Sequence, residues 1–170
     1  SSIDNLEPED YFDGAKLKVR GNTSAFEDKK PYKIKLDKKV DLLKDLIGRD
    51  DSKYNDKEWV LLKGEGLTLN TTVGKAVGEF VGMEWQPELA FVDLYLNGDY
   101  RGVYILIEGV KESESRVAID DDGFLIERDY YYWNEDAYFT TSNMNNYTFK
   151  YPEFESNSEI LPWIKDIVED

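Results

Sequence analysis

Two lysines with alternating spacing, Lys33 and Lys35, form a candidate site for chemistry on an anion. They alternate with the apolar residues of Tyr32–Leu36 and lie within the basic segment Lys29–Lys39. Alternate side chains of a β-strand share a face, so both ammonium groups project from the same side. In a chain of net charge −15 such a pair is a candidate ligand for a nucleotide phosphate. The alternative is that one of the two lysines extends to solvent from an edge strand, where lysine protects against aggregation.

Carboxylates are the other abundant reactive groups, and Glu108 and Glu127 are the strongest single candidates. Each ends an apolar run, where burial would make the carboxylate a candidate functional group; the alternative, and the more common case, is that each is an ordinary strand-end charge. The chain has no His and no Cys, so it lacks the usual general base, the usual zinc ligand and a thiol nucleophile. Any chemistry must therefore use carboxylates, Lys, Arg, Tyr, Ser or Thr, or a hard metal ion.

The remaining motifs are less specific. The run Asp120–Gly123 lacks the spacing of a calcium loop, and a solvated turn is the better interpretation. The aromatic run Tyr130–Trp133 has the side chains to stack on sugars or bases, or alternatively to pack on the core. Gly64-Glu65-Gly66 lacks the Gly and Lys of a phosphate-binding P-loop.

Composition indicates a folded, acidic protein. The 170 residues suit one domain, and 14% aromatic residues argue against disorder. With 36 acidic and 21 basic residues, the charge disfavours nucleic acid and anionic lipid as partners. No apolar run reaches the length of about 18 residues that a membrane span needs. The chain opens Ser1-Ser2-Ile3, from which we expect a processed or excised piece of a longer protein.

A long hairpin is the clearest structural prediction. Two runs of alternating apolar residues flank Asn97-Gly98 within 88–111. Both central positions of a type I′ turn require a positive φ, which Asn and Gly tolerate best, so these residues predict a tight antiparallel turn. The second strand of the hairpin leads directly into Glu108.

Other periodic segments complete an α+β prediction: a mainly antiparallel sheet with one central helix. That helix is expected over Thr71–Val81, with Asn70 as its N-cap and its glycines, spaced every four residues, packed on the sheet. Further strands are expected at Lys16–Arg20, Tyr32–Leu36, Glu58–Leu62, Val117–Ile119, Phe124–Glu127, Tyr138–Thr141 and Tyr147–Tyr151, and further helices at Leu42–Ile47 and Ile160–Val168.

Several segments, taken in order, resemble the CotH family of spore-coat-type atypical protein kinases, which also occur in bacterial surface and cellulosome-linked proteins. The resemblance runs from about 17 to 153, so we expect residues 1–170 to form a single CotH-like domain or its N-terminal portion. The matching segments are Arg20–Ser24, Lys30–Leu36, Trp59–Leu62, Phe91–Lys111, Asp122–Glu127, Phe139–Thr141 and Lys150–Pro152.

The resemblance implies a distant protein-kinase-like fold that binds ATP with Mg²⁺ and phosphorylates Ser or Thr of protein partners. On that basis Lys33 or Lys35 would hold phosphate oxygens, and Glu108 would orient that lysine or reach the metal. Lys150 and Arg20 would be further basic groups near the nucleotide. The resemblance also implies an exported location, at the cell surface or in the spore coat, and a coat or surface protein as partner.

Two departures from the family pattern bear on activity. The family has Asp-Lys and Arg-Asn pairs ahead of its helix, whereas this chain has Glu65–Thr71 there, without those basic residues. The family continues into a second half whose WDFD-like motif carries metal-binding aspartates, and this chain ends at Asp170 before it. We therefore expect little or no kinase turnover from this chain alone. The alternative function is a non-catalytic exported module that binds protein or glycan, and a carboxylate-based hydrolase is a weaker third possibility.

Overall fold

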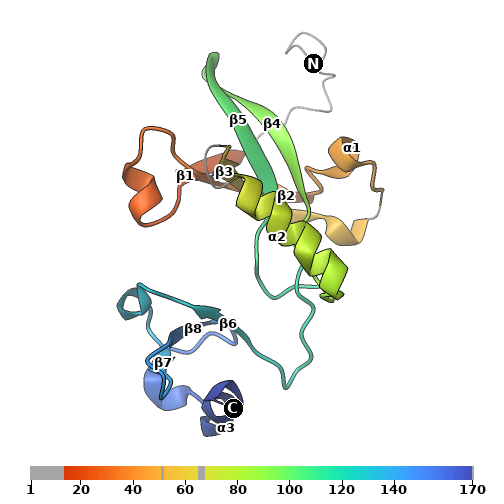
Figure 1. Cartoon of the computed structure of the whole chain (residues 1–170). Coiled ribbons are helices and arrows are strands. Elements are labelled where there is room, and N and C mark those ends of the chain that lie inside the picture. The colour runs from red at the N-terminus through yellow and green to blue at the C-terminus, as the bar shows by residue number, and fades with distance from the viewer. Residues whose placement is uncertain (1–13, 51, 65–67, 170) are drawn as a thin grey trace. The chain divides into compact units, whose positions relative to one another are not determined.

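The computed structural model describes residues 14–50, 52–64 and 68–169, which form two compact units, Ser1–Val110 and Lys111–Asp170 (Figure 1). Each unit has its own antiparallel sheet, and three α-helices accompany the two sheets. The α+β class expected from the sequence is therefore confirmed. The expectation of a single CotH-like domain over 1–170 stays a prediction. Within the described ranges no helix is long and apolar enough to cross a membrane.

The first unit is built on a five-stranded sheet in the order β1-β2-β3-β5-β4, in which all neighbouring strands are antiparallel. Two helices, α1 (Lys44–Ile47) and α2 (Thr68–Val81), belong to this unit. Its strands are β1 (Ala15–Val19), β2 (Tyr32–Val40), β3 (Asp56–Lys63), β4 (Leu89–Leu96) and β5 (Asp99–Glu108).

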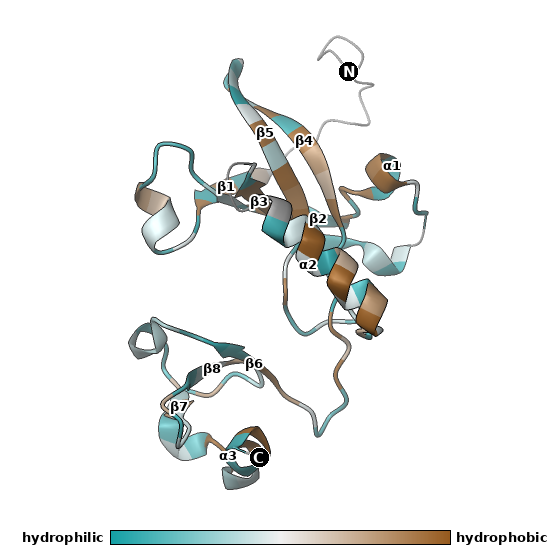
Figure 2. Cartoon of the chain, viewed as in Figure 1, coloured by the Kyte–Doolittle hydropathy of each residue, from teal (hydrophilic) through white to brown (hydrophobic). Residues whose placement is uncertain are grey.

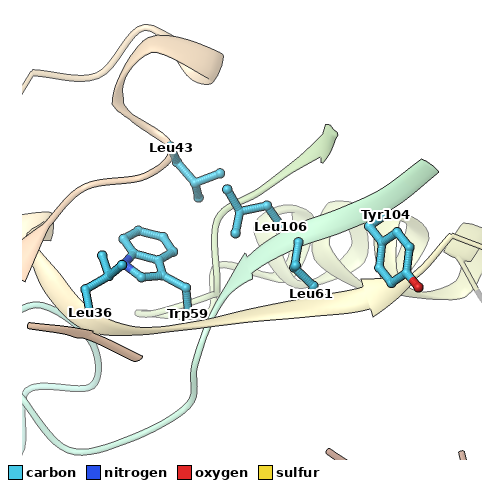
Figure 3. Close-up of a cluster of buried hydrophobic side chains, with 6 residues drawn as sticks. All are labelled: Leu36, Leu43, Trp59, Leu61, Tyr104 and Leu106. Carbon is cyan, nitrogen blue, oxygen red and sulfur yellow. The ribbon is translucent and has the colours of Figure 1, made fainter. Parts of the chain in front are cut away.

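Alternation along β3 and β5 divides the apolar residues between the two faces of this sheet. On one face, Trp59 is fully buried and packs in a cluster with Leu36, Leu43, Leu61, Tyr104 and Leu106 (Figure 3). On the other face, Val60, Ile105 and Ile107 form a separate buried cluster. Both faces of β3 are therefore apolar at its centre, which explains the continuous apolar run Trp59–Leu62.

The hairpin β4–β5 has the predicted turn. Asn97 has φ 53° and Gly98 has φ 85°, the left-handed conformation that a type I′ turn requires at both positions. The turn pairs Leu96 with Asp99, and after a register shift between Leu94 and Tyr95 the hairpin continues to the pair Leu89 and Ile107. The strongest local signal in the sequence thus produced the expected structure.

We predict that Gly98→Ala destabilises the first unit by about 1–2 kcal/mol, because a Cβ is disfavoured in the left-handed region. Gly109→Ala is the matched control, since Gly109 lies outside that region and a Cβ there would meet nothing within 4 Å. Urea denaturation followed by tryptophan fluorescence measures both variants. Equal stability of the two variants would contradict the assigned turn.

Helix α2 differs from its prediction in three respects. It begins at Thr68, so Asn70 lies inside the helix and is not its N-cap. A Cβ added at Gly74 or Gly82 would meet nothing within 4 Å, so the expected glycine seam against the sheet is wrong. Only Gly78 faces another part of the chain closely, the side chain of Gln86. The residues of the apolar stripe are instead exposed, and Phe80 is 90% exposed. Figure 2 shows the hydrophobic residues along the ribbon of α2.

The second unit has a three-stranded antiparallel sheet in the order β6-β8-β7, formed by β6 (Leu125–Arg128), β7 (Tyr138–Thr140) and β8 (Asn146–Tyr151). Its core contains Ala137, Phe139 and Phe149 together with Ile164 of α3 (Pro162–Glu169). Proline is the first residue of α3, where it is tolerated. The strand expected at Val117–Ile119 is absent, because Val117 makes only an isolated bridge to Glu112.

Candidate functional site

Lys33 and Lys35 lie on one face of β2, as predicted, and they face two more lysines on the neighbouring strand. The register places Lys18 of β1 directly opposite Lys33, and Lys16 directly opposite Lys35. Directly opposite residues of an antiparallel pair project from the same face. We call these four residues, Lys16, Lys18, Lys33 and Lys35, the lysine ladder. Every residue of β1 is exposed, so the ladder is open to solvent.

One carboxylate pairs with the ladder. Glu58 of β3 forms an ion pair with Lys33 (Nζ to Oε2, 2.9 Å) and a longer one with Lys35 (Nζ to Oε1, 3.9 Å). The side chains of Lys33 and Lys35 remain 45% and 63% exposed, so neither ammonium group is withdrawn from water. Lys16 and Lys18 have no ion-pair partner in the part of the chain that the structure describes. The ladder is therefore a local concentration of positive charge on an acidic protein.

Arg20 immediately follows β1 and is exposed. Its backbone N–H donates to the carbonyl of Pro31 at 3.0 Å, which closes the connection between β1 and β2. Gly21 has φ 88°, and a Cβ there would meet Ser24 Oγ, so this tight connection requires glycine. Arg20 is thus held at the end of the strand that carries Lys16 and Lys18.

Glu108 lies on the opposite side of the sheet from the lysine ladder. It is directly opposite Trp59 in the register, whereas Lys33 is directly opposite Val60, and Trp59 and Val60 alternate along β3. The expectation that Glu108 orients Lys33 or Lys35 is therefore wrong, because the sheet separates them. The carboxylate that contacts both lysines is instead that of Glu58.

Glu108 instead belongs to a buried ionic cluster centred on Arg49. Arg49 Nη2 donates to Glu108 Oε1 at 2.7 Å, and Arg49 Nε donates to Asp41 Oδ2 at 2.6 Å. Asp41 Oδ1 and Glu108 Oε2 also accept backbone N–H groups, from Leu43 and Glu88 respectively. The cluster joins the segment that leads into α1, the segment after it and the end of β5. Glu108 therefore helps to hold these three segments of the first unit together.

The environment of Arg49 favours its charged form. Burial alone would lower the pKa of the guanidinium, but the hydrogen bonds to Asp41 and Glu108 and their charges outweigh it, and the pKa is raised. The guanidinium also lies over the ring of Tyr54, 4.0 Å from its centroid. The cluster is not evident from the sequence, because residues 37–57 contain many charges and no periodic pattern that selects Arg49 and Asp41.

We predict that Arg49→Met destabilises the first unit by about 3–5 kcal/mol, because it removes the cation that pairs with two buried carboxylates. Arg101→Met is the control, since Arg101 pairs with Asp99 on the surface at 3.4 Å and its loss costs about 0–1 kcal/mol. The measurement is the urea midpoint of each variant. If Arg49→Met proved no more destabilising than Arg101→Met, the cluster would not hold the fold as described.

Lys150, the fourth predicted basic residue, lies on β8 in the second unit. Its ammonium group pairs with Glu127 Oε2 at 2.9 Å, which brings together two residues that the sequence had singled out separately. Burial lowers the pKa of Lys150, but the hydrogen bond to Glu127 and its charge more than compensate, and the net pKa is raised. Lys150 is therefore protonated at neutral pH, and its nearest partner is a carboxylate.

The described residues contain no group of three or more carboxylates arranged to hold a metal ion, so we assign no residue to Mg²⁺. Asp120–Gly123 forms a turn, in which the Gly123 N–H donates to the Asp120 carbonyl at 2.8 Å. In the aromatic run, Trp133 packs edge-on against Tyr132 yet is 61% exposed, so the run both packs and presents a ring to solvent.

The fold and this site define an α+β protein with a cationic sheet face on an acidic chain. The chain belongs to the CotH kinase protein family, whose family model matches residues 17–166. No curated protein matches the chain. The family assignment confirms the resemblance recognised in the sequence.

Proposed function

We propose that this chain is a CotH-like kinase domain, or the N-terminal portion of one, that binds ATP through the phosphates. The observation that supports this most is the pairing of two exposed lysines with a single carboxylate, on one face of a sheet in a chain of net charge −15. An anion that reaches this face meets ammonium groups that the protein's own acids neutralise only in part. Mg²⁺, when bound with the nucleotide, would neutralise further phosphate charge.

Lys33 is the proposed phosphate ligand, and Glu58 is the residue that positions it. Protein kinases hold their nucleotide lysine with a glutamate partner, and catalysis of phosphoryl transfer depends mainly on such positioning. The Lys33–Glu58 ion pair is the shorter of the two at 2.9 Å, so it holds Lys33 more firmly than Lys35. Lys35 and Arg20 are proposed as additional basic groups for the phosphates, and the nucleotide role expected of Lys150 stays a prediction.

Phosphorylation of Ser or Thr in a protein partner is the proposed activity of the complete family domain. The WDFD-like motif that carries the family's metal-binding aspartates does not occur among these 170 residues. We therefore propose that nucleotide binding, and little or no turnover, is the activity of this chain by itself. By analogy with the family we also propose an exported location and a coat or surface protein as partner.

The prediction that tests ATP binding is made on Lys33. Lys33→Ala should weaken ATP binding about tenfold or more, because a hydrogen bond to a charged group contributes about 1.5–3 kcal/mol. Lys57→Ala is the matched control, since Lys57 is exposed on β3 at a position that alternates with Glu58. Isothermal titration calorimetry with and without Mg²⁺ measures both. No heat at millimolar ATP, or equal affinity in Lys33→Ala and wild type, would refute the proposal.

The second candidate function is a non-catalytic exported module that binds protein or glycan. It is favoured by the exposed rings of Tyr130 and Trp133 in the second unit and by the replacement of the family's basic pairs at Glu65–Thr71. Aromatic rings with an apolar face and an exposed edge are well suited to such contacts. Absence of nucleotide binding in the calorimetric experiment would support this candidate over the first.

A further inference from the structure

We propose that the anion site extends onto β1, so that Lys16 and Lys18 bind the oligophosphate tail of the nucleotide together with Lys33 and Lys35. This inference rests on the proposed function, because it takes the same face of the same sheet as the ATP site. It adds two residues, Lys16 and Lys18, for which the sequence predicts only a place on a strand. It also specifies the ligand as a compact anion with several charges.

The register determines the shape of the site. Lys18 is directly opposite Lys33 and Lys16 is directly opposite Lys35, so the four Cβ atoms occupy the corners of a small rectangle. Its short side is about 4.5–5.5 Å, the separation of directly opposite residues, and its long side is about 6.6–6.8 Å, two residues along a strand. Lysine side chains are long and flexible, so all four ammonium groups can converge on one small anion above the sheet.

The like charges make this arrangement unfavourable in the absence of a ligand. Identical charges directly opposite each other on neighbouring strands repel and destabilise the pair. Here this occurs twice in succession, and Glu58 is the single carboxylate that pairs with any of the four lysines among the described residues. Asp37 follows Lys35 by two residues, but its carboxylate lies against Gly14. A bound polyanion would remove the repulsion.

The geometry favours a compact anion over an extended acidic polypeptide. An acidic strand added to β1, the edge strand, would meet Lys16 and Lys18 but would be separated from Lys33 and Lys35 by β1 itself. An extended polyanion would also continue over the acidic remainder of the surface. An oligophosphate concentrates its charges within one Debye length, about 8–10 Å, and so interacts mainly with the ladder.

The test uses inorganic tripolyphosphate and ATP as ligands in calorimetric titrations at low ionic strength. Lys18→Gln and Lys16→Gln should each weaken both ligands about three- to tenfold, while Lys57→Gln, which removes the same charge elsewhere on the sheet, should change them less than twofold. The ligand-free Lys18→Gln protein should have a Tm equal to or above that of wild type, because a repulsive pair is lost. That result shows that the loss of binding is not a folding defect.

The outcomes separate this inference from the proposed function. If Lys33→Ala weakens ATP but Lys16→Gln and Lys18→Gln match the Lys57→Gln control, ATP binding stands and the four-lysine site is overturned. If tripolyphosphate binding depends on all four lysines and ATP binds no better than tripolyphosphate, the anion site stands without a nucleotide function. If a hexaglutamate peptide binds more tightly than tripolyphosphate, and through Lys16 and Lys18, the ligand is an acidic polypeptide and the inference is overturned. No binding of either phosphate ligand overturns both.

Discussion

The alternation of side chains across the antiparallel register of β1, β2, β3 and β5 is the constraint on which the site depends. It places Lys18, Lys33 and Glu58 on one face and Trp59 and Glu108 on the other. A shift of one residue in any of these pairings would exchange the two sets and bury the lysines. The apolar cores on both faces of β3 prevent such a shift, because each face has its own buried residues to lose. The burial of the two apolar clusters thus determines which face of the sheet carries the lysine ladder.

Charge in the first unit is divided between two environments with different consequences. The Arg49 cluster is buried, with side chains of Arg49, Asp41 and Glu108 only 12%, 3% and 2% exposed, and Arg49 Nη1 is a buried donor without a hydrogen-bond partner. Breaking one partner of such a cluster is costly, although the intact cluster need not add net stability over an apolar replacement. The lysine ladder is exposed, contributes little to the fold and carries repulsion.

The sequence predicted those parts of the fold that depend on local patterns. The Asn97-Gly98 turn, the strands around Tyr32–Leu36 and Trp59–Leu62, and the shared face of Lys33 and Lys35 all follow from short-range rules and are present. Helix α2 was expected to bury its apolar stripe, and periodicity alone could not reveal that the stripe is exposed. The pairing of Lys18 with Lys33 and of Arg49 with Glu108 joins residues far apart in sequence, so neither could be read from spacing. The expected pairing of Glu108 with Lys33 or Lys35 was wrong for that reason.

The most direct test of the central claim is a titration of ¹⁵N-labelled protein with ATP, followed by NMR. The account predicts that the largest amide shifts fall on β1 and β2 at the lysine ladder and on Glu58, and that Trp59 and Glu108, whose side chains face away, shift less. Shifts that centre on the Arg49 cluster, or that are confined to the second unit, would contradict the assignment of the anion site to this face.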